Sequence, residues 1–153
     1  MVPVPSGLQH HMLFEDPFVA AIAADHPLAK RTTLKLANLA GLPLILYPKN
    51  PASSFAAHML NLVRAHGIEP QISNEAMDEI HTALGLVAAG MGYTIMGASV
   101  AERGPQDLAF VPIAELTETT RVIAITKATD TNPLVKAMLT ILENEKPDKI
   151  PRL

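Results

Sequence analysis

Residues 42–68, LPLILYPKNPASSFAAHMLNLVRAHGI, are the stretch around which the rest of this chain is expected to fold. The apolar run 42–47 is long enough for one strand that is covered on both faces of a sheet. Pro48 ends that strand, and the PASS segment at 51–54 supplies a stiff turn with hydroxyl side chains that can cap a helix. We therefore expect a buried strand, a tight turn and a helix that stops at Gly67.

This order of elements predicts an anion-binding turn. A strand whose carboxyl end leads straight into a helix leaves backbone N–H groups facing a crevice, where they and the helix dipole favour negative charge. Ser53 and Ser54 lie in the turn, where one is expected to cap the helix and either can also contact an anion. The same order recurs where the strand expected at 92–96 leads into Gly-Ala-Ser at 97–99.

Strands alternate with helices along the rest of the chain. A break at Glu15, Asp16 and Pro17 separates the first two expected strands, and we interpret it as a bend or a crossing between lobes. The alternation predicts an α/β fold with mainly parallel strands and a ligand crevice at their carboxyl ends. The expected strands are 11–14, 19–23, 71–76, 92–96, 108–112 and 121–126, and the expected helices are 34–41 with Thr32 or Thr33 as cap, 78–90, 98–103 and 132–144.

The composition is that of a globular domain without a DNA-binding face. At 153 residues the chain suits one ordinary domain or two small lobes. Hydrophobic residues make up 48% and charged residues 18%, which excludes a disordered chain and a charged fibre. A net charge of −3 with scattered lysines provides no basic face for DNA phosphates, so any DNA contact is expected from another segment.

Several classes of chemistry are excluded by residues that the chain lacks. Without cysteine there is no disulfide, thiolate nucleophile or cysteine-bound metal.

The amino-terminal residues contain no signal peptide, and no segment reaches the roughly 18 apolar residues of a membrane span, so we expect a cytoplasmic protein. His10 and His11 are expected to lie passively on the faces of a strand, and we expect no metal site and no cofactor.

Four sequence stretches carry a family resemblance. They are 13–29 (LFEDPFVAAIAADHPLA), 42–70 (which adds EP to the opening stretch), 83–99 (ALGLVAAGMGYTIMGAS) and 108–113 (LAFVPI). Their order and spacing resemble the effector-binding region of LysR-type transcriptional regulators over about residues 8–145. The YPxxPxxxF pattern that runs from Tyr47 to Phe55 is most similar to the branch that senses aromatic compounds and the dicarboxylic acids of their breakdown.

The resemblance implies a periplasmic-binding-protein-like (type 2), Rossmann-like α/β fold of two lobes with an effector between them. It assigns residues 1–16 to a crossing strand and remnant of the first lobe, and 17–117 to a complete second lobe. Residues 118–145 are the return strand and terminal helix of the first lobe, and 146–153 are a tail. By this comparison the winged-helix DNA-binding domain and half of the first lobe are expected to be absent from the chain.

The resemblance also implies an effector site. The turn at Ser53, Ser54 and Phe55 contacts the effector, with serine and backbone donors towards a carboxylate and Phe55 as an apolar wall. Glu79 matches a position near the same cleft. From the residues alone, Phe55 is more simply a core residue and Glu79 a solvent-exposed one at a helix start, where the dipole favours a carboxylate.

Ser99 is the remaining residue that we expect at the ligand, at the second strand-to-helix turn. Gly97 stands two positions before it, where relatives usually carry proline. This departure bears on the rigidity of the turn and not on the donors of Ser99.

Enzyme motifs are incomplete. Ser54 with His58 one turn further on resembles a nucleophile and a base, but there is no Gly-x-Ser-x-Gly elbow and no interpretable acidic partner. Gly85, Gly90 and Gly92 mimic a dinucleotide fingerprint, yet they fall within and after a helix, whereas the fingerprint follows a strand and opens a helix. We therefore expect no catalytic residues.

The sequence thus predicts a non-catalytic fragment of a LysR-type effector-sensing domain that binds a small aromatic or dicarboxylic carboxylate to control transcription. The alternatives are a transport-type solute-binding module and a small α/β hydrolase or isomerase. Because half of the first lobe is expected to be absent, strands 11–14 and 121–126 should leave apolar surface that self-association buries. A homo-oligomer is therefore expected, with weak effector binding by this chain.

Overall fold

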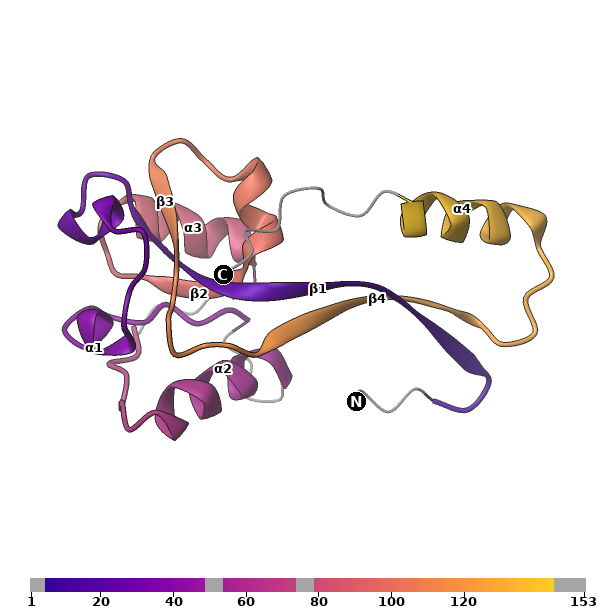
Figure 1. The fold of residues 1–153 in the computed structure, drawn as a ribbon, viewed down its shortest axis with the longest axis horizontal. Coiled ribbons are helices and arrows are strands. Elements are labelled where there is room, and N and C mark those ends of the chain that lie inside the picture. Colours follow the sequence, from indigo (N-terminus) through magenta and orange to yellow (C-terminus); the bar gives the residue numbers. More distant parts are fainter. Residues whose placement is uncertain (1–4, 49–53, 74–78, 145–153) are drawn as a thin grey trace.

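Two antiparallel sheets share one long strand in the computed structural model, which describes residues 5–48, 54–73 and 79–144 (Figure 1). The shared strand is β1 (Leu8–Ala23), and its first half pairs with β4 (Thr119–Lys127) in a two-stranded ribbon. Its second half pairs with β2 (Thr94–Gly97) on one side and β3 (Leu108–Pro112) on the other. The strand order of this second sheet is β2-β1-β3, so β1 runs through its middle.

β1 changes sheets at Pro17. Pro17 is opposite Thr119 in the ribbon, and the next residue, Phe18, is opposite Gly97 in the second sheet. The expected break into two strands is therefore wrong, although the expected crossing is found as this change of sheet. Proline is tolerated because the residue without an N–H donor stands where pairing with β4 ends.

The expectation of mainly parallel strands is wrong for the strands that the structure describes. β1 pairs antiparallel with β2, β3 and β4, because it runs through the centre of the fold opposite in direction to all three. Parallel pairing occurs at three isolated bridges, which join Leu34 to Ile113, and Leu44 to both Ile72 and Tyr93. The α/β class itself is confirmed, with mixed pairing.

The strand expected at 42–47 is a short extended segment rather than a full strand. The N–H of Leu44 donates to the carbonyl of Gln71 at 2.7 Å, and the N–H of Ile45 donates to the carbonyl of Tyr93 at 2.8 Å. Leu44 and Ile45 are buried, so the segment is central as expected. The strand expected at 71–76 is likewise represented by its bridge at Ile72, and residues 74–78 lie outside the described part of the chain.

The second half of β1 is buried on both faces, which explains its uninterrupted apolar sequence. Phe18, Ala20 and Ile22 face one hydrophobic cluster, whereas Val19 and Ala21 face another. Helices α1 (Leu36–Leu39) and α2 (Ser54–Ala65) cover the first cluster, and α3 (Ile80–Ala88) covers the second. Figure 1 shows α2 and α3 on opposite sides of the sheet.

α2 has the amphipathic pattern that its sequence predicts. Met59, Leu62 and Val63 are buried against the sheet, while His58 and Arg64 are exposed. The chain leaves the helix at a glycine, as expected, since Gly67 adopts a φ of +75° that other residues rarely tolerate.

α1 begins later than its expected caps. Thr32 and Thr33 do not cap it, because Leu34 is held in a bridge to Ile113 and the helix starts only at Leu36. At its start, the N–H of Lys35 donates to Oδ1 of Asn38 at 2.9 Å, and the N–H of Leu36 donates to Oε2 of Glu115 at 3.1 Å. A carboxylate from the segment after β3 therefore satisfies one of the free donors at this end.

The short 3₁₀ helices η1 (Pro27–Lys30) and η2 (Ala98–Arg103) follow β1 and β2, and α4 (Pro133–Asn144) follows β4. α4 lies alongside the ribbon, away from the second sheet (Figure 1). It carries an exposed stripe of Leu134, Met138 and Ile141, which are 75%, 55% and 53% exposed. No helix within the described residues is long and apolar enough to cross a membrane.

Candidate functional site

Two strand-to-helix turns lie at the same edge of the second sheet. The 44–47 segment leads towards α2, and β2 leads into η2. The two segments run in the same direction, because the bridge from Leu44 to Tyr93 is parallel. Carboxyl ends of parallel segments meet at one edge, so the starts of α2 and η2 share that edge, as expected for a ligand crevice. We call this edge the α2–η2 edge.

An aromatic group forms one part of the α2–η2 edge. The rings of Tyr47 and Phe55 have centroids 5.7 Å apart at 40°, and the Phe55 ring lies 6.5 Å from the fully buried ring of Phe18. The ring of His58 lies 6.1 Å from Phe18. Phe55 is half-buried, so it packs on the core while part of it remains exposed.

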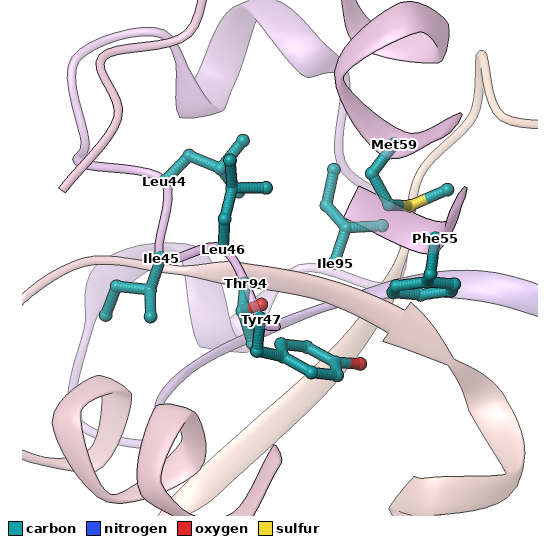
Figure 2. Close-up of a pocket in the computed structure, with 8 residues that line it drawn as sticks. All are labelled: Leu44, Ile45, Leu46, Tyr47, Phe55, Met59, Thr94 and Ile95. Carbon is teal, nitrogen blue, oxygen red and sulfur yellow. The ribbon is translucent and has the colours of Figure 1, made fainter. Parts of the chain in front are cut away.

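Side chains from this group border a narrow apolar hollow (Figure 2). The hollow has no room for a water-sized molecule, because buried core side chains close it. The described residues therefore form an apolar wall here and not an enclosed cavity. The lining residues are Leu44, Ile45, Leu46, Tyr47, Phe55, Met59, Thr94 and Ile95.

A buried carboxylate forms the other part of the edge. Asp16 is 3% exposed, and its Oδ1 accepts a hydrogen bond from the N–H of Ser99 at 2.9 Å. Its Oδ2 accepts one from the hydroxyl of Ser99 at 2.7 Å. Both donors of Ser99 are thus used by a residue of the crossing strand. Asp16 was not expected at the site. The sequence feature that could have indicated it is an acidic residue directly before Pro17, where the chain crosses between sheets.

The Asp16 carboxylate also explains the glycine at position 97. Gly97 has φ −69° and ψ 143°, an extended conformation that proline also adopts. The backbone therefore does not require glycine. A Cβ at this position would overlap the carboxylate of Asp16, so the space is already filled.

Burial raises the pKa of both tyrosine phenols in this region. Desolvation raises the pKa of Tyr47, and the negative charge of Asp16 raises it further. Burial raises the pKa of Tyr93, which precedes β2, from 10.0 to about 12. Both phenols therefore keep their protons further into the alkaline range than a free tyrosine does.

The structure places Ser54, Phe55 and Ser99 at the α2–η2 edge and Glu79 at the start of α3. Ser53 lies outside the described residues, and Ser54 is the first residue of α2. Phe55 contacts Tyr47, and Ser99 contacts the side chain of the crossing strand. Glu79 is exposed and stands at the N-cap position of α3 without a capping hydrogen bond from its side chain, and α3 covers the opposite face of the sheet from α2.

Comparison with known proteins identifies the family of ligand-binding domains to which this fold belongs. The family model described as the LysR substrate binding domain matches residues 1–146. The chain belongs to this family, and the curated relatives described below are transcriptional regulators rather than enzymes.

Two curated relatives show the extent of the sequence similarity. The HTH-type transcriptional regulator CatR of Pseudomonas putida is 38% identical over 139 residues, which are 91% of this chain and 47% of CatR. The regulator BenM of Acinetobacter baylyi is 33% identical over 111 residues, which are 71% of this chain and 36% of BenM. The chain therefore spans less than half the length of these relatives.

Solved structures confirm the periplasmic-binding-protein-like fold. CbnR, a LysR family transcriptional regulator, superimposes with a TM-score of 0.79 at 25% identity, over 97% of this chain and 51% of CbnR. The BenM effector binding domain with its effector benzoate superimposes with a TM-score of 0.73 at 25% identity, over 94% of this chain and 65% of that domain.

Proposed function

We propose that this chain senses a small aromatic or dicarboxylic carboxylate and thereby controls transcription. The observation that carries the proposal is the half-buried aromatic pair of Tyr47 and Phe55 beside the start of α2. An aromatic wall next to backbone donors at a helix start suits a ligand with an apolar body and a carboxylate. The likeness to a BenM domain solved with benzoate supports the same ligand class.

The proposed contacts follow the two turns of the α2–η2 edge. Ser53 and Ser54, with the backbone at the start of α2, donate to the effector's carboxylate, and Phe55 packs against its apolar body. Glu79 and Ser99 lie beside the ligand in this proposal, and both donors of Ser99 are engaged by Asp16 rather than by the effector. Helix-end contacts of this kind contribute about 0.3 to 2 kcal/mol each, so several must combine for useful affinity.

We also propose how the chain is divided and what surrounds it. Residues 17–117 form the second lobe of an effector domain, and 1–16 with 118–145 belong to the first lobe, before a tail at 146–153. DNA binding belongs to a winged-helix domain outside these residues; CbnR, to which the chain is similar, was solved with its target DNA. The working protein is a cytoplasmic homo-oligomer, in which the effector shifts the arrangement of the lobes and so of the DNA-binding domains.

Titration with benzoate and with cis,cis-muconate tests this function. We expect saturable binding that is weak, with a Kd on the order of 1 mM, because this chain offers only one wall of the proposed cleft. Phe55→Ala should abolish it, whereas Phe110→Ala, a half-buried phenylalanine on β3, should leave it intact. Absence of binding by both compounds, or equal binding by the two variants, would contradict the proposal. Micromolar affinity would show that the single wall is sufficient.

A further inference from the structure

We infer that Asp16 is a built-in anion that occupies a carboxylate-binding corner of the α2–η2 edge and so determines where an effector's carboxylate can bind. The corner is formed by Ser99 and Gly97, and we call it the Ser99 corner. Because Asp16 fills it, the α2 end of the edge is left to receive the effector's negative charge. The inference rests on the proposed function only for the nature of that effector.

The Ser99 corner holds a carboxylate with both of its oxygens engaged. The N–H of Ser99 donates to Oδ1 of Asp16 at 2.9 Å, and the Ser99 hydroxyl donates to Oδ2 at 2.7 Å. Hydrogen bonds to an ionised acceptor are shorter and stronger than those between neutral groups. An approaching effector carboxylate would therefore have to displace two good hydrogen bonds to use Ser99.

The corner is also shaped for this carboxylate. Gly97 leaves the space that Oδ2 of Asp16 occupies, and a Cβ there would overlap it. Asp16 is 3% exposed, so the group is enclosed rather than resting on the surface. Asp16 arrives on β1, at the residue before the change of sheet, and β1 is anchored by its partners on both sides of that point. A tethered carboxylate placed in this way occupies the corner without the entropy loss that a free ligand incurs.

The charge of Asp16 extends towards the aromatic wall. It contributes, after burial, to the raised pKa of the Tyr47 phenol, so the two groups interact electrostatically. A second carboxylate near Ser99 would meet this buried negative charge and be repelled. Asp16 is therefore a specificity-determining residue, because among the described residues of this wall it leaves the start of α2 to accept an anion.

Removal of the tethered carboxylate should open the corner to a free one. We expect Asp16→Ala to lower the Tm by about 4 to 8 °C, because Ser99 loses its charged acceptor. Sodium formate, which matches the deleted carboxylate in size and charge, should then raise the Tm of this variant by a few degrees. The wild-type protein should gain no more Tm from formate than from sodium chloride at equal ionic strength.

Two variants serve as controls. Glu15→Ala removes the neighbouring acidic side chain, which is about half exposed and lies 3.8 Å from Arg121, so formate should not restore its Tm. Asp16→Asn removes the charge but keeps the side chain in place, so it should also fail to respond to formate. The double variant Asp16→Ala/Ser99→Ala should respond less than Asp16→Ala, because one of the two donors is lost.

The inference is overturned if folded Asp16→Ala shows no formate response beyond chloride, or if Glu15→Ala responds equally. Should Asp16→Ala fail to fold, the ¹H–¹⁵N spectrum of Asp16→Asn decides instead. A large shift of the Ser99 amide proton, against small changes elsewhere, supports a charge-assisted bond at that amide, and an unchanged Ser99 resonance contradicts it.

This test is independent of the proposed effector class. If neither benzoate nor cis,cis-muconate binds the wild-type protein, the proposed function fails while the formate response still decides the role of Asp16. If both bind, Ser99→Ala should change their Kd values by less than about twofold, because Ser99 holds Asp16 rather than the effector. An increase of tenfold or more in either Kd would show that Ser99 contacts the ligand and would contradict the inference.

Discussion

The centroid of the Phe55 ring lies 5.7 Å from that of Tyr47 and 6.5 Å from that of Phe18. Tyr47 precedes the turn into α2, and Phe55 is the second residue of that helix. Phe18 is the first residue of β1 in the second sheet and is fully buried. This contact joins the start of α2 to the point where the chain crosses between sheets.

Loss of the Phe55 ring should therefore weaken folding as well as binding. We expect Phe55→Ala to reduce the free energy of unfolding by about 1 to 3 kcal/mol, less than the cost at a fully buried phenylalanine, because the ring is half-buried. Urea denaturation monitored by circular dichroism measures the change. A reduction below about 0.5 kcal/mol would show that the ring contacts contribute little.

Because the Asp16 carboxylate fills the space beside Gly97, a single added methyl group should destabilise the fold. Gly97→Ala should reduce the free energy of unfolding by about 1 to 3 kcal/mol, because its Cβ would overlap the Asp16 carboxylate. Gly85→Ala in α3 is the matched control, since its Cβ would enter open space, and it should be neutral or stabilising by up to about 1 kcal/mol. The Gly97→Ala cost should shrink in an Asp16→Ala background; equal costs in the two backgrounds would rule out the steric origin.

Stability should decline at alkaline pH through the tyrosines. The pKa of Tyr93 rises from 10.0 to about 12 on folding, and that of Tyr47 rises in the same direction. A raised pKa means that the folded state keeps its proton longer, so the stabilisation is complete below pH 10 and is lost as pH rises towards 12. Urea denaturation from pH 8 to 11 measures this loss, and Tyr93→Phe should reduce its slope.

The absorbance of tyrosinate supplies an independent measurement. The chain has two tyrosines and no tryptophan, so the near-ultraviolet change on ionisation comes from Tyr47 and Tyr93 alone. In the folded protein it should appear well above pH 10 and should shift towards pH 10 in urea. Ionisation near pH 10 in the folded state would contradict the burial of both phenols.

The exposed stripe of α4 predicts self-association. Leu134, Met138 and Ile141 lie at positions i, i+4 and i+7 on one side of the helix, and all three are more than half exposed. Sedimentation velocity should show concentration-dependent association, and Met138→Lys should weaken it. Lys136→Gln on the same helix is the control and should change little; a monomer at high concentration would contradict the prediction.

Local sequence determined much of the secondary structure. The amino-terminal boundary expected for the terminal helix is confirmed, because Pro133 suits the first helical turn and Oδ1 of Asn132 accepts a hydrogen bond from the N–H of Leu134 at 3.0 Å. The strand expected at 108–112 is also confirmed with its boundaries. The amphipathic face of α2 follows from apolar spacing alone. In each case the decisive residues lie within one or two helical turns or along one strand.

Tertiary structure decided the features that join distant parts of the chain. Asp16 and Ser99 are 83 positions apart, so no local pattern relates the carboxylate to the donors that hold it or to the missing side chain of Gly97. The course of β1 through Pro17, which local propensity disfavours, depends on partners from β4 and β2. The direction of strand pairing is likewise set by the long crossing strand. The sequence by itself thus determined many of the elements and the family resemblance, whereas long-range pairing decided the course of β1 and which side chains meet at the α2–η2 edge.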